Sequence, residues 1–204
     1  MIGCGDDHIA IKSGFNAAGR AFAMPSQNIT VRNNVFWQGR GISIGSEVSG
    51  GVSDVLIAAN TLHGPSEHGI HIKTSAARGG FVRNVVIRDN VLGNITGDAL
   101  LGILTSYGSK KSPDPAPVLT QIGNIRWSNI TRLAGAPNIG HGAGNFGCFS
   151  QAPCANLTWS NIALNPVGSP PWRCEHVSGM AVENVSPAGL SDACKAANQL
   201  YKYK

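Results

Sequence analysis

The sequence predicts an all-β fold in which short parallel strands stack into a solenoid. Two observations lead to this prediction: helical periodicity is almost absent, and two different short apolar patterns recur along the chain. The composition is a third, because 26 of the 204 residues are Gly, as a fold with many tight turns requires. The hydrophobic fraction of 42% is ordinary for a globular protein and the charged fraction of 13% is low, so disorder is not expected.

The first repeated pattern is a short apolar segment that ends in Asn. It occurs as NITVRN (28–33), DVLIAAN (54–60), NVVIRDN (84–90), NIRWSN (124–129), NLTWSN (156–161) and MAVEN (180–184). Asn tolerates left-handed backbone geometry, which suits a turn that recurs at the same place in every coil. Stacked Asn side chains can also form hydrogen-bonded ladders.

The second pattern lies between occurrences of the first. It occurs as HIAIKS (8–13), GISIGS (41–46), GIHIKT (69–74) and GILTSY (102–107). This spacing predicts coils of about 30 residues, each with two or three short strands, in one domain over residues 1–204. A β-sandwich would show hairpin turns every 8–12 residues or so, and a propeller would show a fixed blade motif; neither is evident.

Alternate side chains of the second pattern are expected to face opposite sides of the sheet. If the isoleucines stack inside, four basic side chains share one outer face: His8, Lys12, His71 and Lys73. Adjacent coils stack about 4.8 Å apart, so an extended polymer lying across this face would contact one coil after another. Asp6 and Asp7 are expected at its edge.

The formal net charge of +5 favours an anionic partner. On charge alone the partner could be a polyuronate, a nucleic acid or an acidic membrane surface, and a mildly basic surface without such a partner is the alternative. No stretch is long and apolar enough to span a membrane. The first residues, MIGCGDDHIAIKSG, lack the features of a signal peptide.

The cysteines predict disulfides and hence an oxidising compartment. Cys4 stands alone near the start, and the other four lie in the last third of the chain, at Cys148, Cys154, Cys174 and Cys194. Metal binding is the alternative, but the spacings match no common zinc pattern, so no metal is expected. Five N-x-[ST] sequons also favour a secreted glycoprotein; they lie at Asn28, Asn94, Asn129, Asn156 and Asn184.

The adjacent carboxylates of Asp6 and Asp7 are the strongest candidates for chemistry. Two neighbouring carboxylates repel each other, so at least one must find a hydrogen-bond donor or change its pKa. Glycoside hydrolysis uses such a difference, because one carboxyl protonates the leaving oxygen while another carboxylate activates water. A solvated turn is the ordinary alternative for a bare Asp-Asp pair.

The residues around this pair extend into a longer pattern. Four segments, GDDHIAIKSG (5–14), MPSQNITVRN (24–33), GRGISIGSEVSGGV (39–52) and GIHIKTSAARGGFVRNV (69–85), resemble those of the polygalacturonase family of glycoside hydrolases, especially its plant-like branch. The resemblance implies a right-handed parallel β-helix of the pectin-lyase-like type, of which this chain holds C-terminal coils without the N-terminal ones. It also implies inverting hydrolysis of α-1,4-galacturonan linkages in pectin, without a cofactor or metal.

The same resemblance implies a secreted or cell-wall protein whose partner is polygalacturonate or pectin. We expect a monomer that binds neither nucleic acid nor a membrane. Cys174–Cys194 is expected to hold the C-terminal tail, from about residue 166, over the last coil, and Cys148–Cys154 to close a tight loop, although the sequence alone allows other pairings.

The resemblance also gives roles to individual residues. Asp6 matches the general acid that protonates the glycosidic oxygen, and Asp7 matches a carboxylate that holds and activates the attacking water. Lys73 matches a lysine that binds a substrate carboxylate, and Tyr107 matches an aromatic residue of the cleft. Lys12 joins this set from its place on the outer face. Without the family pattern, the lysines could be solvated charges and Tyr107 a packing residue.

Three departures from the family pattern bear on activity. The family has another catalytic Asp, in an N-T-D motif one coil earlier, upstream of the first residue here. Arg40 replaces the family's catalytic-site His, and His71 replaces an Arg that grips a carboxylate with its fixed fork. Arg40 could restore a nearby cation, and a protonated His71 could still donate hydrogen bonds. We therefore expect the 204-residue chain by itself to hydrolyse little or no substrate.

Two further interpretations stay open on sequence grounds. The chain could be a catalytically degenerate β-helix that binds pectin without cutting it, or an inactive fragment. The Gly-rich segment around Gly140-His141-Gly142 and the segment KKSPDPAP (110–117) are expected to be loops, and His68 is expected at a turn.

Overall fold

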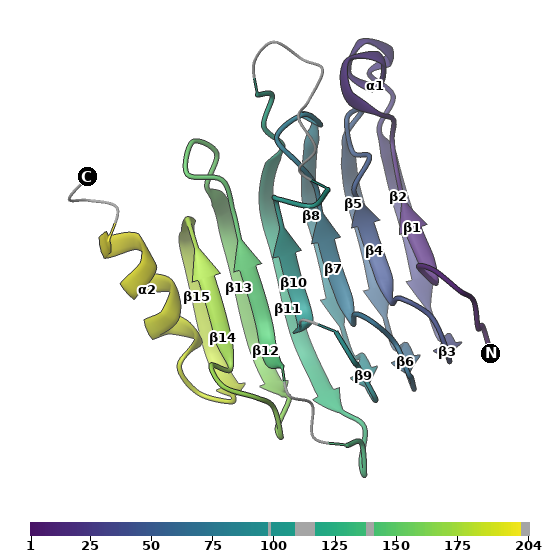
Figure 1. Ribbon diagram of the computed structural model, residues 1–204, viewed down its shortest axis with the longest axis vertical. Coiled ribbons are helices and arrows are strands. Elements are labelled where there is room, and N and C mark those ends of the chain that lie inside the picture. Colours follow the sequence, from purple (N-terminus) through teal and green to yellow (C-terminus); the bar gives the residue numbers. More distant parts are fainter. Residues whose placement is uncertain (98, 109–116, 138–140, 201–204) are drawn as a thin grey trace.

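The protein is a parallel β-helix. The computed structural model describes residues 1–97, 99–108, 117–137 and 141–200, with side chains up to residue 196. The strands form two sheets, and each strand pairs in parallel with its equivalent in a neighbouring coil. Figure 1 shows the coils succeeding one another from the N-terminal to the C-terminal end. The predicted solenoid is confirmed.

The first sheet carries the second sequence pattern. Among the described residues it has six strands, in the spatial order β1 (Ile9–Ile11), β4 (Ile42–Gly45), β7 (Ile70–Lys73), β10 (Ala99–Leu104), β12 (Gly142–Gly147) and β14 (Trp172–Glu175). The register places Ile44 between Ile11 and Ile72, as the pattern predicts. Ile44 and Ile72 are buried, so this side of the sheet faces the core.

The second sheet carries the Asn-bounded pattern. Its long strands are β2 (Ser26–Arg32), β5 (Val52–Ala58), β8 (Phe81–Arg88), β11 (Gln121–Arg132), β13 (Cys154–Ala163) and β15 (Val177–Ser186). Short strands continue around the next corner as β3 (Val35–Phe36), β6 (Thr61–Leu62) and β9 (Val91–Leu92). Strand β11 pairs with β8 at its start and with β9 at its end, which joins them into one sheet.

Residues with a left-handed backbone conformation lie at the start and at the end of each repeated segment of the second sheet. Positive φ angles occur in pairs five positions apart, at Asn28/Asn33, Asp54/Ala59, Asn84/Asp89, Asn124/Asn129 and Asn156/Asn161. Asn and Asp reach this conformation more readily than most residues. Side-chain amides also connect the coils, because Asn34 Nδ2 donates to Asn60 Oδ1 and Asn60 Nδ2 donates to Asn90 Oδ1, each at 3.1 Å. Both the recurring turn and the amide ladder were expected, and both are present.

The core changes in character along the stack. The early coils bury Ile and Val side chains, whereas the later coils bury aromatic rings. Trp127 and Trp159 stack with their ring centroids 5.0 Å apart and their planes 4° from parallel, and Phe146 packs against both rings edge-on. Both indole rings are fully buried.

Helices and disulfides flank the strands. Helix α1 (Asn16–Phe22) follows β1, and helix α2 (Leu190–Leu200) ends the described chain. Disulfides join Cys148 to Cys154 and Cys174 to Cys194, the two expected pairings. The second disulfide links β14 to α2, so the segment from about residue 166 contains β14, β15 and a covalently attached helix. Cys4 is a free thiol.

One expectation from the sequence is wrong. Residues Gly142–Gly147 form strand β12 instead of a loop, and this strand pairs with β10 and β14. Glycine is needed there because the Trp172 ring lies against the strand, and a Cβ added to Gly144 would approach that ring to 2.6 Å. Phe146 provides a fully buried side chain. Gly140 and nearly all of the other expected loop, 110–117, lie outside the described residues.

Candidate active site

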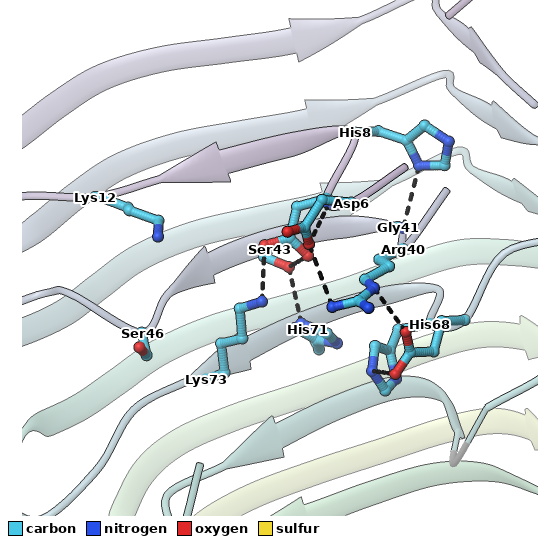
Figure 2. A network of polar contacts seen from close by, with 12 residues as sticks. Asp6, His8, Lys12, Arg40, Gly41, Ser43, Ser46, His68, His71 and Lys73 are labelled. Atoms are coloured by element: carbon cyan, nitrogen blue, oxygen red, sulfur yellow. Dashed lines mark hydrogen bonds and ion pairs between the residues drawn. The ribbon is translucent and has the colours of Figure 1, made fainter. Parts of the chain in front are cut away.

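The Asp7 carboxylate is the centre of a polar cluster on the first sheet. Its Oδ2 accepts a hydrogen bond from Lys73 Nζ at 2.7 Å, and its Oδ1 accepts one from Ser43 Oγ at 2.7 Å. Only 10% of the Asp7 side chain and 7% of the Lys73 side chain are exposed. In Figure 2, Ser43 and Lys73 point toward each other from separate strands. Each buried charge therefore compensates the other, as removal of either would leave an unpaired ion.

His71 extends this cluster as a neutral hydrogen-bond donor. Its Nε2 lies 2.8 Å from Ser43 Oγ. Because the single Ser43 proton is donated to Asp7, Ser43 can only accept from His71, so His71 Nε2 carries a proton. Burial, together with the nearby His68 and Lys73, lowers the His71 pKa to about 3. The result is a chain of donors that runs from His71 through Ser43 to Asp7.

Asp6 lies in a much more open environment than Asp7. Its side chain is 77% exposed, and its Oδ1 accepts the Asp7 backbone N–H at 2.9 Å. Arg40 Nη1 lies 3.6 Å from the same oxygen, while Arg40 Nε pairs with Glu67 Oε2 at 2.9 Å. His68 Nε2 is 3.4 Å from the other Glu67 oxygen. The two adjacent carboxylates thus differ in burial and partners, which is the asymmetry that two-carboxylate chemistry requires.

Tyr107 adds an aromatic surface beside the buried cluster. Lys73 Nζ lies 4.8 Å from the centroid of the Tyr107 ring, within the range of a cation–π contact. The ring is 41% exposed, so one part of it remains available to a ligand. Lys73 therefore sits between a carboxylate and an open aromatic ring.

Lys12 does not join the cluster. Its Nζ pairs with Glu47 Oε2 at 2.6 Å, and Arg78 Nη2 lies 3.7 Å from the other Glu47 oxygen. Although burial raises the pKa of Glu47, its bonds to Lys12 and the neighbouring Ser46 lower it on balance. Figure 2 shows Lys12 well apart from Asp6 and Ser43. Lys12 thus borders the expected face at some distance from the acidic pair.

His8 was expected on the outer face, and this expectation is wrong. The residue is 8% exposed, and its ring packs on Phe36 with the centroids 5.0 Å apart. The Gly41 N–H donates to His8 Nδ1 at 3.1 Å, which leaves Nε2 as the donor to the Gln38 carbonyl at 3.1 Å. Burial also lowers its pKa. His8 fixes the backbone next to the site and offers no ring nitrogen to a substrate.

The described part of the chain contains no group of three or more His, Cys, Asp or Glu side chains that could hold a metal ion. Nor does it contain a helix whose length and apolar character would let it cross a membrane.

Comparison with known proteins identifies the family. Residues 1–187 match the sequence model of "Glycosyl hydrolases family 28". The chain belongs to this family. The matched residues of this family 28 chain include the stacked coils and the acidic pair.

Its relatives are longer proteins. A "Probable polygalacturonase" from Vitis vinifera is 30% identical over 200 residues, which cover 92% of this chain and 38% of the relative. The crystal structure of an exopolygalacturonase from Thermotoga maritima matches with a TM-score of 0.70 and 26% identity, over 88% of this chain and 39% of that one. A family 28 exopolygalacturonase from Yersinia enterocolitica shares the fold, with a TM-score of 0.57 and 19% identity. This family 28 chain thus spans less than half the length of these relatives.

The structure brings most of the predicted site residues together and adds two others. Asp6, Asp7, Arg40, His71, Lys73 and Tyr107 lie in one connected set of contacts. Sequence reasoning missed the roles of Ser43 and Glu67. Ser43 could have been found, since it is an outward-facing residue of the second pattern and its register partner is His71. Nothing in the pattern around Glu67 distinguishes it from a solvated turn residue.

Proposed function

We propose that this chain provides the acidic pair and the substrate-binding face for inverting hydrolysis of α-1,4-galacturonan in pectin. The observation that carries the proposal is the difference between Asp6 and Asp7. Asp6 is open to solvent beside Arg40, whereas Asp7 is nearly buried and held at both oxygens. Such a pair can divide the tasks of protonating the leaving oxygen and holding the attacking water.

In this proposal Asp6 is the general acid, since only an accessible carboxyl can reach a glycosidic oxygen. Asp7 holds the water, and Ser43 and Lys73 fix the orientation of its carboxylate. An inverting reaction needs roughly 6.5–9.5 Å between acid and base so that water fits between them and the sugar. A further carboxylate contributed by the rest of a longer protein is compatible with this arrangement.

The cations of the site are suited to a polyuronate. Lys73 has further N–H donors besides the one bound to Asp7, and Arg40 lies at the exposed edge of the cluster. His71 is neutral and its Nε2 proton is already used, so it positions Ser43 and does not supply charge to the substrate. Tyr107 offers a partly exposed ring against which a sugar can pack. The two disulfides support a secreted location, where pectin is found.

A second candidate function is pectin binding without turnover. Arg40 and His71 favour it, because they stand where the family pattern has a catalytic-site His and a carboxylate-binding Arg. In this case the acidic pair would help to organise the face without completing a reaction. The same experiment can decide between the two candidates.

The test is reducing-end release from polygalacturonate by the 204-residue chain and by the same chain joined to the upstream coils of a family 28 relative. Each is compared with its Asp6→Asn variant, and Arg126→Gln on the second sheet is the control. Turnover that Asp6→Asn lowers at least about a thousandfold would support hydrolysis, because loss of the acid removes a transition-state interaction. Binding of polygalacturonate with no turnover in either form would favour the second candidate, and absence of both would contradict both.

A further inference from the structure

One row of outward-facing residues runs across the first sheet from the acidic pair toward the C-terminal coils. In register, Ser43 is beside His71, His71 is beside Gly102, Gly102 is beside Asn145, and Asn145 is beside Arg173. Neighbouring strands lie about 4.8 Å apart, so Arg173 is about 14 Å from His71 along this row. The row therefore connects the candidate active site to a second cation.

Two adjoining hollows follow the same row. The first is lined in part by His71, Gly102 and Asn145, and the second, of about 220 Å³, by Asn145, His141 and Arg173 among others. Asn145 lines both hollows, so the two hollows are neighbours on the sheet. The lining of the second hollow is mainly polar, which suits a hydrated, hydroxyl-rich ligand better than an apolar one.

Gly102 lines the first hollow and lies between His71 and Asn145 in the row. It has no side chain, and a Cβ added there would lie 3.2 Å from the Asn145 carbonyl oxygen and 3.6 Å from His71 Cβ. A larger residue at this position of the row would rise between His71 and Asn145. The glycine therefore places no side chain between His71 and Asn145 on this face of the sheet.

Arg173 differs from the cations of the candidate active site in having no anion beside it. Lys73 pairs with Asp7, Arg40 with Glu67 and Lys12 with Glu47. Among the described residues, Arg173 forms no ion pair, and Glu175, two positions further along β14, does not pair with it. Arg173 is exposed. A guanidinium without a partner can bind a carboxylate through two parallel hydrogen bonds.

We infer that Arg173 and Asn145 form a distal subsite that binds the carboxylate of a uronic acid residue. The ligand is one extended anionic glycan that lies over His71 and Gly102 and reaches the acidic pair at its other end. This inference rests on the proposed function, because it takes the same polymer as ligand. It adds that affinity depends on the length of the glycan. Ser43, which holds Asp7, lies four strand spacings from Arg173, so only a chain that spans about 19 Å can contact both places.

The test measures binding of digalacturonate and hexagalacturonate by titration calorimetry at low salt. All proteins carry Asp6→Asn so that the glycan is not cleaved. Arg173→Gln should weaken hexagalacturonate binding about tenfold and leave digalacturonate binding at the active site unchanged. Arg173→Lys should retain part of the affinity, because it keeps the charge but loses the planar fork. The control Arg126→Gln removes an equally exposed cation from the second sheet and should change neither affinity.

The outcomes separate the two proposals. If hexagalacturonate binds the parent and the Arg173→Gln protein equally well, the distal subsite is wrong while the proposed function stands. Equal weakening of both oligomers would also contradict it, because a distal contact cannot act on a ligand that does not reach it. If neither oligomer binds the parent protein, both proposals are wrong. Thermal unfolding monitored by circular dichroism checks that each variant is folded.

Discussion

The coils that carry the acidic pair and the coils at the C-terminal end share one backbone repeat but are stabilised in different ways. Around β4 and β7 the core is a stack of isoleucines, and the outward positions bury polar side chains such as Ser43 and Lys73. Around β12 and β14 the core is aromatic, and a disulfide attaches α2. Large exposed apolar side chains gather at the N-terminal end, where Phe22 is 77% exposed.

This difference shows which coils of the repeat can hold polar, chemically active side chains. Key polar groups of the early coils are buried together with a partner, as Lys73 is with Asp7 and Ser43 is with His71. The later coils, by contrast, have fully buried rings and covalent links. The predictions below test whether the early and the late coils depend on different contacts for their stability.

The largest effect is expected in the aromatic core. Trp159→Ala should lower the free energy of unfolding by about 4 kcal/mol, because it leaves a large cavity between Trp127 and Phe146. The matched control is Trp37→Ala in the early coils, where the ring is 42% exposed and stacks on His63, and the loss should stay below about 1 kcal/mol. Urea denaturation measures both values. Similar losses for the two variants would mean that the late coils are not specially dependent on their rings.

A slightly smaller effect is expected from the buried ion pair. Lys73→Met should cost about 3 kcal/mol, because it leaves the Asp7 carboxylate nearly buried without its cation. Lys12→Met removes the partner of Glu47 from a more exposed pair and should cost at most about 1 kcal/mol. The double variant Asp7→Asn/Lys73→Met should recover part of the loss. If the double variant is as unstable as Lys73→Met, packing and not the unpaired charge explains the cost.

The last effect concerns pH and is the smallest of the three when it is expressed per pH unit. His71 has a pKa of about 3 in the folded protein, against about 6.5 when unfolded, so below pH 6.5 the unfolded chain takes up a proton that the folded chain does not. This residue therefore contributes no pH dependence above pH 6.5 and lowers the free energy of unfolding by about 1.4 kcal/mol per pH unit between pH 6.5 and 3. His71→Gln should reduce that slope, measured by urea denaturation at several pH values. The exposed His141→Gln is the control, and an unchanged slope in His71→Gln would show that the ring is accessible to protons when folded.

Much of the fold follows from short-range patterns in the sequence. The Asn-bounded segments predict their own turns because Asn reaches positive φ readily, and the alternating isoleucines fix which side of the first sheet faces the core. Strand β12 was not predicted because three of its six residues are glycines, and the ring that packs on Gly144 comes from Trp172 of the next coil. A contact between two different coils leaves no periodic pattern in the sequence.

The positions of the charged residues in the candidate site were predictable where the pairing of the strands brings them together. Lys73 and Arg40 lie near the acidic pair because β4, which follows Arg40, pairs with β1, and β7, which ends at Lys73, pairs with β4. The burial of His8 was not predictable from alternation, since it depends on bonds to the backbone around Gly41 and on packing against Phe36. The role of Glu67 depends on the direction of the Arg40 side chain, which periodicity does not specify.

The paired residues with positive φ in the second sheet determine where a protein of this kind can accept insertions. They are always five positions apart, so this side of every coil is a rung of constant length. The amide contacts between equivalent rungs nevertheless join residues that are 30, 40 and 32 positions apart in the sequence. Insertions are thus accommodated between the rungs, at the connections to the first sheet. Such a scaffold can acquire longer loops around its binding face over generations while the spacing of its coils stays the same.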